Sequence, residues 1–415
     1  MPILISVEDL EAGMCLARNL VNQFSVLLPH GHKITERDIE SLKRVIPGRY
    51  VQITDPLLDE MVDFENDTHD TTVSQTVRKN VATVMKKVDS QIRSGVKLDS
   101  NNVAGMEKAI NDMLEYLKDN PVTMAIVEQS NSWDSYLQEH SANVLYLSMV
   151  IGNTIRNYIK NERERLSASK RIHNAMNLTP LASGAMFHDI GMVPIKKVYR
   201  KEEPLTEEER ELIRSHPEAG ANMLPDNVNP MVRMIVRTHH ENNRGTGYPQ
   251  GLAGDKINIF ARIVRVADAY TAAISNNVYI KAKTPVMALH EMIHTPVRTY
   301  YDPVVLKVLS SIVAPFPVGA KIKLVSGKWA VVVNQNYQDT FKPQVIVAFD
   351  ELGDPLPKDQ LRPPIALSST DEVMVDSFAG EDLKFINDLA PVEEPAQAET
   401  ENETIPDDLF DFVFP

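Results

Sequence analysis

Cysteine is almost absent from this sequence, because Cys15 is the single one in 415 residues. A lone cysteine excludes a disulfide framework and a thiolate metal cage, and it is typical of a reducing compartment. Long apolar runs are also missing, since none approaches the roughly 20 residues that a membrane helix needs. The first residues, MPILISVEDLEAGM, lack the basic stretch and apolar core of a signal peptide. We therefore expect a cytoplasmic protein without a membrane span.

An excess of positive charge is missing as well. The formal net charge is −14, and residues 368–415 contain fourteen Asp or Glu and one Lys, so this tail carries −13 and the remainder −1. The chain shows no basic stripe, which argues against DNA as a partner. The composition of the whole chain, 43% apolar and 24% charged residues, is ordinary for a globular protein.

Changes in residue pattern divide the chain into five parts. Residues 1–56 predict a small α/β module, and residues 57–125 are polar with a helical pattern that predicts a linking region. Residues 126–315 form one apolar-periodic helix after another, and residues 316–365 contain three β-rich runs between turn residues. Residues 366–415 are acidic, and we expect them to be disordered up to a terminal DDLFDFVFP that resembles a docking peptide. The fold class is therefore mainly α, with a small β-module after the helices.

Histidines and aspartates recur beside the apolar patterns of the helical part. FHDIG presents an imidazole and a carboxylate from successive positions, and MVRMIVRTHH ends in two further imidazoles. Taken singly, each histidine is more often a core or surface residue than a ligand. Buried ionisable groups nevertheless need partners or a metal, and imidazoles with carboxylates suit Fe, Mn, Zn or Ni. The candidate ligands are His140, His188, Asp189, His216, His239, His240 and Asp268. Seven ligands are too many for one ion, so the set favours two ions that share a carboxylate.

Six motifs in this region follow one another in a recognisable order: HSANV, HDIG, HPEAG, HHE with GTGYPQGL, ARIVRVADAY and YYDP. In order and spacing they resemble the HD-GYP domain, a subgroup of the HD superfamily of metal-dependent phosphohydrolases. The resemblance covers residues 130–315. Residues 1–56 resemble the small domain that often precedes HD-GYP domains, and residues 316–365 resemble a β-extension that often follows them.

The resemblance implies an HD-type helical bundle that hydrolyses the bacterial second messenger cyclic di-GMP at an iron or manganese centre, with other divalent metals possible. Carried over by position, the first metal is bound by His140, His188, Asp189 and Asp268. Asp189 bridges to a second metal held by His216, His239 and His240, and a bridging hydroxide attacks phosphorus. Asp189 and His188 are the catalytic residues in this scheme. Three-metal members carry a glutamate where this chain has Tyr136, so we predict two metals.

Several positions depart from the family pattern. Met192 stands where the family has a phosphate-binding lysine, and Asn277 and Ile280 stand at two further basic positions. Charge-assisted contacts are each worth roughly 1.5–3 kcal/mol, so their loss would weaken binding of a phosphodiester and leave the metals intact. Three nearby cations could replace them and are the candidate substrate contacts: Arg244, Lys196 and Lys281.

Three functions stay open from the sequence. The first is a cyclic di-GMP phosphodiesterase, and the second is a phosphodiesterase for another cyclic dinucleotide such as cyclic GMP-AMP. The third is a metal-binding sensor or interaction module with little or no turnover, whose GYP loop or acidic tail contacts a signalling protein such as a GGDEF-domain cyclase. HEMIH at 290–294 matches the short zinc-protease signature, but no third ligand is evident and the match is attributed to chance.

Overall fold

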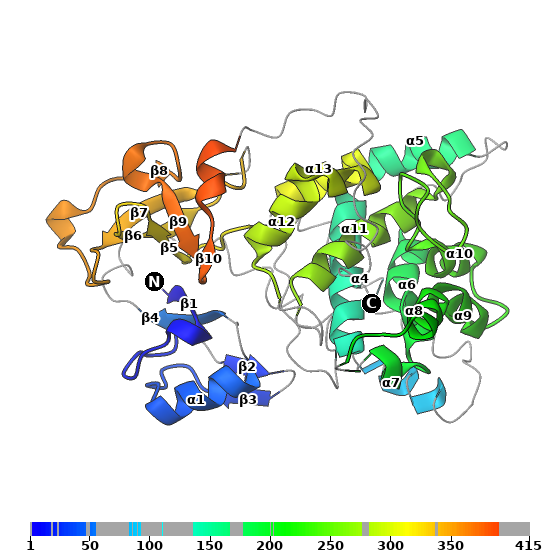
Figure 1. Ribbon diagram of the computed structural model, residues 1–415, viewed down its shortest axis with the longest axis horizontal. Helices are drawn as coiled ribbons and strands as arrows, with labels where there is room; N and C mark the ends of the chain where they lie inside the picture. Colours follow the sequence, from blue (N-terminus) through cyan, green and yellow to red (C-terminus); the bar gives the residue numbers. More distant parts are fainter. Residues whose placement is uncertain are drawn as a thin grey trace. The chain divides into compact units, whose positions relative to one another are not determined.

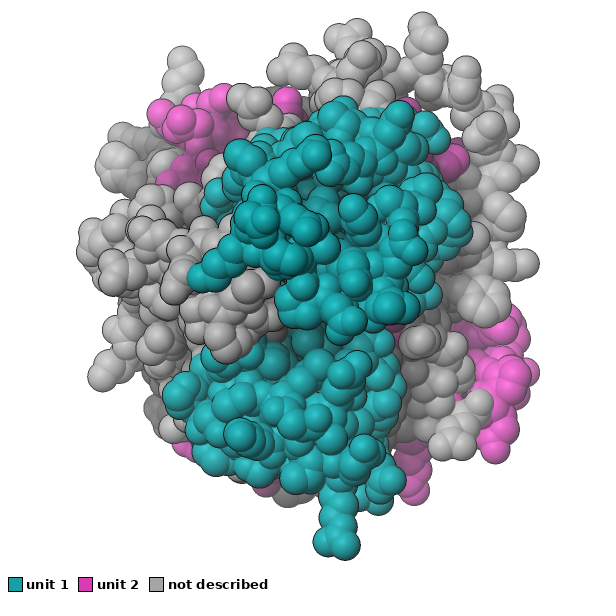
Figure 2. All heavy atoms as spheres, turned by 90° about the vertical axis from the view of Figure 1, so that its left-hand side faces the viewer, with its two compact units in different colours: residues 1–68, 284–287, 313–399 teal, residues 69–283, 288–312, 400–415 magenta. Residues whose placement is uncertain are grey.

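The computed structural model describes two compact units of the chain, whose elements are labelled in Figure 1 and whose atoms are coloured separately in Figure 2. The first unit comprises residues 1–68, 284–287 and 313–399, and the second comprises residues 69–283, 288–312 and 400–415. The described residues are 2–17, 20–22, 25–46, 50–54, 83–84, 86–88, 90–92, 110, 136–166, 177–199, 201, 203–275, 282–336 and 339–389. Most of the predicted linking region and the terminal DDLFDFVFP lie outside these residues, so both remain predictions.

The N-terminal part of the first unit combines two strand pairs with one helix. β1 (Pro2–Ser6) pairs antiparallel with β4 (Tyr50–Thr54), and β2 (Leu20–Asn22) pairs antiparallel with β3 (Ser25–Leu28). A 3₁₀ turn, η1 (Val7–Asp9), follows β1. Helix α1 (Glu36–Val45) begins with a capping box, in which the Thr35 hydroxyl accepts from the Asp38 amide and the Asp38 carboxylate accepts from the Thr35 amide.

A six-stranded antiparallel sheet forms the C-terminal part of the same unit, in the order β10-β9-β5-β6-β7-β8. Its strands are β5 (Lys321–Leu324), β6 (Trp329–Asn334), β7 (Gln344–Phe349), β8 (Ile365–Ala366), β9 (Val375–Phe378) and β10 (Glu381–Asp382). Ile5 of β1 packs against the cluster formed by Val331, Val333, Ile346, Ala348 and Phe349 of the sheet. Ile5 also packs against the N-terminal cluster, so it joins the apolar clusters of two end modules that the sequence presents as separate.

The sheet extends beyond the boundary predicted at residue 365, and the expectation of disorder from residue 366 is wrong for residues 366–389. This segment supplies β9, β10, and the 3₁₀ turns η6 (Asp371–Val373) and η7 (Lys384–Asp388). The physical reason is a set of spaced apolar side chains among the acids, all of which are buried: Leu367, Val373, Val375, Phe378, Leu383 and Ile386. Burial of these side chains stabilises the segment, while its carboxylates stay at the surface.

The second unit is helical, so the fold is mainly α, as the sequence predicts. Its long helices are α4 (Tyr136–Thr154), α5 (Arg156–Leu166), α6 (Thr179–Phe187), α8 (Glu207–Arg214), α9 (His216–Met223), α10 (Pro230–Thr238), α11 (Ile259–Ala273), α13 (Pro303–Ile312) and, from residue 288 on, α12 (Pro285–His294). Shorter turns are η2 (Ile190–Met192), α7 (Lys196–Tyr199), η3 (Gly254–Lys256) and η4 (Pro296–Tyr300). Among the described residues, no helix combines the length and the apolar character that crossing a membrane requires.

Helices α4, α6 and α11 lie at the centre of the helical unit and pack on one another. Nearly every residue of α6 and α11 is buried, which explains why their sequences read as continuously apolar rather than amphipathic. Arg262 of α11 forms ion pairs with Glu162 of α5 and with Asp302, whose other oxygen caps the start of α13. This buried network fixes α11, which carries one of the candidate metal ligands, against two neighbouring helices.

Candidate metal centre

The ends of several helices place the predicted ligands in one cluster. His140 lies on α4 and Asp268 lies on α11, while His188 and Asp189 follow the last residue of α6. His216 begins α9, and His239 with His240 follows the last residue of α10. Asp189 is the most exposed member, with 14% of its side chain accessible, whereas the histidines and Asp268 are buried. Asp189 is therefore the member of the cluster that solvent contacts most.

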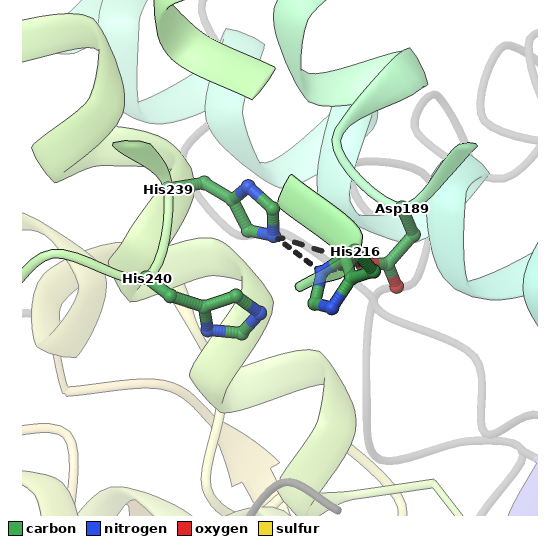
Figure 3. A group of neighbouring side chains, drawn as sticks. All are labelled: Asp189, His216, His239 and His240. Atoms are coloured by element: carbon green, nitrogen blue, oxygen red, sulfur yellow. Dashed lines mark hydrogen bonds and ion pairs between the residues drawn. The ribbon is translucent and has the colours of Figure 1, made fainter. Parts of the chain in front are cut away.

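The two carboxylate oxygens of Asp189 face different histidines. Oδ1 lies 3.2 Å from Nε2 of His216 and 3.6 Å from Nε2 of His239. Oδ2 lies 3.2 Å from Nε2 of His188 and 3.8 Å from Nε2 of His140. Figure 3 shows the first side of this arrangement, with His216 and His239 converging on Asp189 and the ring of His240 beside them. The carboxylate thus joins two groups of ligand atoms, each compact enough for a cation.

Asp268 completes the group on the Oδ2 side. Its Oδ1 lies 3.0 Å from Nε2 of His140 and 3.7 Å from Nε2 of His188. On the other side, the atoms of Asp189, His216, His239 and His240 lie within 4.8 Å of one another. The described residues therefore offer two adjoining positions that share one carboxylate.

Backbone carbonyls at the helix ends orient three of the imidazoles. Nδ1 of His188 donates to the carbonyl of Ala185 at 2.8 Å, and Nδ1 of His216 donates to Ile213 at 2.7 Å. His239 makes the same contact three residues back, at 2.8 Å to the carbonyl of Val236. Because a carbonyl can only accept, the proton is on Nδ1 in each ring and Nε2 points into the cluster. This is the arrangement that holds metal-ligating histidines in proteins.

Buried polar atoms without hydrogen-bond partners show that the cluster fits a cation. Among the described residues, Nδ1 of His140 and Oδ2 of Asp268 are buried without a hydrogen-bond partner, and Nε2 of His188 faces the carboxylates of Asp189 and Asp268 at 3.2 and 3.7 Å. Such atoms are costly unless a ligand satisfies them. Imidazole nitrogens and carboxylate oxygens without thiolates are a donor set for a divalent metal, and the residues present fit that group.

The pKa shifts of the cluster follow from burial and from its own charges. Burial disfavours a charged His188, but the charges and hydrogen bonds of Asp189 and Asp268 outweigh burial and raise its pKa to about 10. Burial would raise the pKa of both aspartates, but their histidine contacts hold it well below the usual range. Burial lowers the pKa of His239 to about 4, against the effect of its Asp189 contact. Without metal, the proton on His188 supplies the positive charge that the two carboxylates require.

Glu241 of the HHE motif has a structural role in the GYP loop. Its side chain is only 1% exposed, and its two oxygens accept from the backbone amides of Gln250 and Leu252 at 2.7 and 2.8 Å. The loop in turn covers one imidazole, since the ring of Tyr248 stacks on His240 with centroids 4.7 Å apart. The two histidines of the motif therefore line the cluster, and the glutamate shapes the loop over it.

The cationic side chains predicted to contact substrate are less clearly placed. Arg244 is exposed, and its guanidinium lies over the ring of Tyr300 at 5.6 Å from the centroid. Lys196 begins α7 and is half-buried. Lys281, together with Asn277 and Ile280, lies outside the described residues. Their contacts with substrate remain predictions.

Two residues that the sequence did not assign to the site as ligands contact its histidines. Arg265, 4% exposed, donates from Nη1 to Nδ1 of His240 at 3.4 Å. Tyr136 stacks on His140, with centroids 5.4 Å apart and rings inclined by 6°; burial and the charges of Asp189 and Asp268 raise its pKa, so its phenol stays neutral. Helical spacing could have indicated Tyr136, which precedes His140 by four residues on α4, whereas the contact of Arg265 with His240 joins residues far apart in the sequence.

The HEMIH segment forms no comparable site. His290 and His294 lie one turn apart on α12 with their rings stacked at 5.4 Å, and Glu291 forms an ion pair with Lys283. Within the described part of the chain, the groups of three or more metal-binding side chains are the two that share Asp189. The zinc-protease interpretation therefore gains no third ligand there.

Comparison with known proteins finds similarity in the helical region that carries the cluster. Residues 146–305 match the family model of the HD domain, beginning six residues after His140. The chain is 36% identical over 167 residues to a cyclic di-GMP phosphodiesterase of Pseudomonas aeruginosa, covering 40% of each protein. It is 30% identical over 199 residues to the cyclic di-GMP phosphodiesterase PdeB of Borreliella burgdorferi, covering 47% of this chain and 48% of that protein.

A third relative is named for a different nucleotide. The chain is 29% identical over 126 residues to a 3'3'-cGAMP-specific phosphodiesterase of Vibrio cholerae, covering 30% of this chain and 27% of that protein. The chain thus spans less than half the length of these curated relatives. The helical domain belongs to the HD domain family. Its motifs and relatives identify it more closely as an HD-GYP domain.

Proposed function

We propose that this protein is a metal-dependent phosphodiesterase that hydrolyses cyclic di-GMP at a binuclear centre. Its family and the names of its relatives support the reaction class and the substrate. The ions are iron or manganese, with other divalent metals able to take their place. By the family resemblance, the first metal is held by His140, His188, Asp189 and Asp268, and the second by Asp189, His216, His239 and His240.

The division of Asp189 between two groups of imidazoles is the observation that carries this proposal. One oxygen faces His216 and His239, and the other faces His188. A carboxylate in this position would hold two cations close together, an arrangement that stabilises both the attacking and the leaving oxygen of an in-line displacement at phosphorus. Tyr136 favours two ions over three, because its neutral phenol lies where three-metal relatives of this domain would carry a glutamate ligand.

The residues of the chain prepare the site for this chemistry. When bound, two divalent ions would neutralise phosphate charge and lower the pKa of a water to near neutrality. The carbonyls of Ala185, Ile213 and Val236 hold three imidazoles in the ligand tautomer before any metal arrives. Asp189, as the most exposed member, marks the side from which the phosphodiester enters.

A second candidate substrate is cyclic GMP-AMP. The specific observation in its favour is Met192, which follows Gly191 where the family pattern has a phosphate-binding lysine. A changed phosphate contact fits a changed substrate, and one relative is named for cyclic GMP-AMP. The same change also fits a domain that binds metal and nucleotide with little turnover and acts through a partner, such as a GGDEF-domain cyclase that contacts the GYP loop.

The test is a comparison of metal content and product formation. The protein is purified anaerobically, its metals are counted, and it is incubated with both dinucleotides under Mn²⁺ and Fe²⁺. Two ions per chain with release of a linear dinucleotide or GMP is the expected result. Asp189→Ala should abolish both, whereas His290→Ala, a histidine of the same helical domain outside the cluster, should change neither. Two ions without product from either nucleotide would refute hydrolysis of these nucleotides and favour the sensor function.

A further inference from the structure

The histidines around Asp189 differ in the group that their Nδ1 atom contacts. The Nδ1 atoms of His188, His216 and His239 each donate to a backbone carbonyl. At His240 the group facing Nδ1 is the guanidinium of Arg265, with Nη1 at 3.4 Å. The Nδ1 atom of His240 is therefore turned toward a donor, where those of three other imidazoles of the cluster face an acceptor.

This difference determines which nitrogen of His240 carries the proton. A guanidinium has only N–H groups and stays charged in proteins, so the Nδ1 atom that faces it must accept. A neutral imidazole that accepts at Nδ1 has its proton on Nε2. A metal ligand needs a lone pair, so His240 in this tautomer offers an N–H to the cluster instead of a coordinating nitrogen.

Packing holds the pair of side chains in this arrangement. Arg265 is 4% exposed, and its guanidinium lies over the ring of Tyr301 at 5.8 Å from the centroid. Tyr248 covers the other partner, with its ring inclined by 23° to that of His240. Arg265 comes from the same helix as Asp268, three residues earlier, so α11 supplies a carboxylate to one part of the cluster and a cation to another. A fixed positive charge behind His240 disfavours a metal cation there and favours an anion.

We propose that Arg265 makes His240 a hydrogen-bond donor to an anionic phosphate oxygen of the substrate, and that the second metal is held by Asp189, His216 and His239 alone. This differs from the ligand role that the family resemblance gives His240. The proposal rests on the proposed phosphodiesterase function for the identity of the anion. It also supplies a hydrogen-bond donor to phosphate, with the charge of Arg265 behind it, in a chain where Met192 replaces the expected lysine.

The first test is the protonation state of His240 in the intact protein. Histidine labelled with ¹⁵N, assigned with His240→Gln, should give an unprotonated Nδ1 and a protonated Nε2, in both the metal-free and the zinc-loaded protein. In Arg265→Gln, whose amide oxygen can accept, the proton should move to Nδ1. A wild-type His240 with its proton on Nδ1 would overturn the proposal. This readout needs no turnover, so it stands even if neither dinucleotide is hydrolysed.

The second test separates ligation from anion binding, with zinc and inorganic phosphate as probes. His239→Ala should lose one zinc ion per chain, whereas His240→Ala should keep the wild-type number. The affinity of the zinc-loaded protein for phosphate should fall about tenfold in His240→Ala and in Arg265→Met, as expected for loss of one charge-assisted contact. Loss of one zinc ion in His240→Ala, or unchanged phosphate affinity in both variants, would refute the assignment. If zinc content and phosphate affinity change as expected but neither dinucleotide is hydrolysed, the proposed function is refuted and the assignment of His240 stands.

Discussion

Asp189 is the residue at which the two groups of imidazoles meet, because Oδ1 lies against His216 and His239 while Oδ2 lies against His188. We expect Asp189→Asn to lose both ions, since each position loses a charged ligand. Asp268→Asn is the matched control, because its carboxylate contacts only His140 and His188 and its loss should remove one ion. Metal counts with Mn²⁺, together with loss of the magnetic coupling between two manganese ions, distinguish these outcomes. Equal metal content in the two variants would contradict the bridging role.

The raised pKa of His188 predicts how metal affinity depends on pH. With a pKa of about 10, this imidazole is protonated in the metal-free protein at neutral pH, and a metal must displace that proton. The pKa values of Asp189 and Asp268 lie well below the usual range, so both carboxylates already carry their charge. Affinity for zinc should therefore rise about tenfold per pH unit between pH 7 and 9 for this proton.

Calorimetry in buffers of different ionisation enthalpy measures that release directly. At least one proton should leave the protein per pair of ions bound at pH 7.5. Zinc affinity that stays constant over this range would show that His188 is already neutral. His188→Ala should abolish this part of the pH dependence as well as weaken binding at the first position.

At the scale of elements, close contact between η2 and α9 sets the distance from Asp189 to His216. A Cβ atom added at Gly191 would lie 2.1 Å from the backbone carbonyl oxygen of His216, which cannot move without moving the start of α9. Gly191→Ala should therefore lower stability by about 1–3 kcal/mol and weaken the second metal position. Gly152→Ala is the control, since its Cβ would meet side-chain methyl groups of Leu181, at 2.7 Å, and Leu178, at 3.7 Å, and no backbone atom outside its own helix within 3.7 Å. Thermal unfolding and zinc titration of both variants test this, and equal effects would contradict it.

The GYP loop depends on Glu241, whose two oxygens accept the amides of Gln250 and Leu252. Glu241→Ala leaves these buried contacts unmade and should cost about 2–4 kcal/mol of loop or global stability. Hydrogen exchange at residues 248–252 should accelerate, while the zinc content stays unchanged because Glu241 is not a ligand. Loss of zinc in this variant would show that the loop contributes to metal binding directly.

The position of each site residue within its helix explains whether it could be predicted from the sequence. His188, His216 and His239 stand at helix ends, where short local motifs mark them, and their orientation comes from carbonyls three residues away. The contact of Arg265 with His240 joins residues 25 positions apart and depends on how α11 packs, so no local pattern indicates it. In residues 366–389 the acidic composition concealed the spacing of Val375, Phe378 and Leu383, whose burial orders the segment.

For the whole molecule, the sheet predicts where the chain can be shortened. A protein ending at residue 389 should unfold at the temperature of the full chain, because all described strands remain. A protein ending at residue 365 loses β9 and β10 and the buried side chains Val375, Phe378 and Leu383. Each buried apolar side chain contributes about 1.5–3 kcal/mol, so this truncation should unfold the first unit. Circular dichroism melts and solubility compare the two proteins, and identical melts would contradict the role of this segment.

The first unit is assembled from residues on both sides of the helical domain in the sequence, and Ile5 shares its core with Val331 and Ile346. During synthesis on the ribosome, β1 emerges more than three hundred residues before the sheet that buries Ile5. The helical domain can therefore fold first, while Ile5 lacks its contacts with Val331 and Ile346 until the sheet is made. The metal-binding domain can thus be complete before the first unit, although synthesis starts with residues of the first unit.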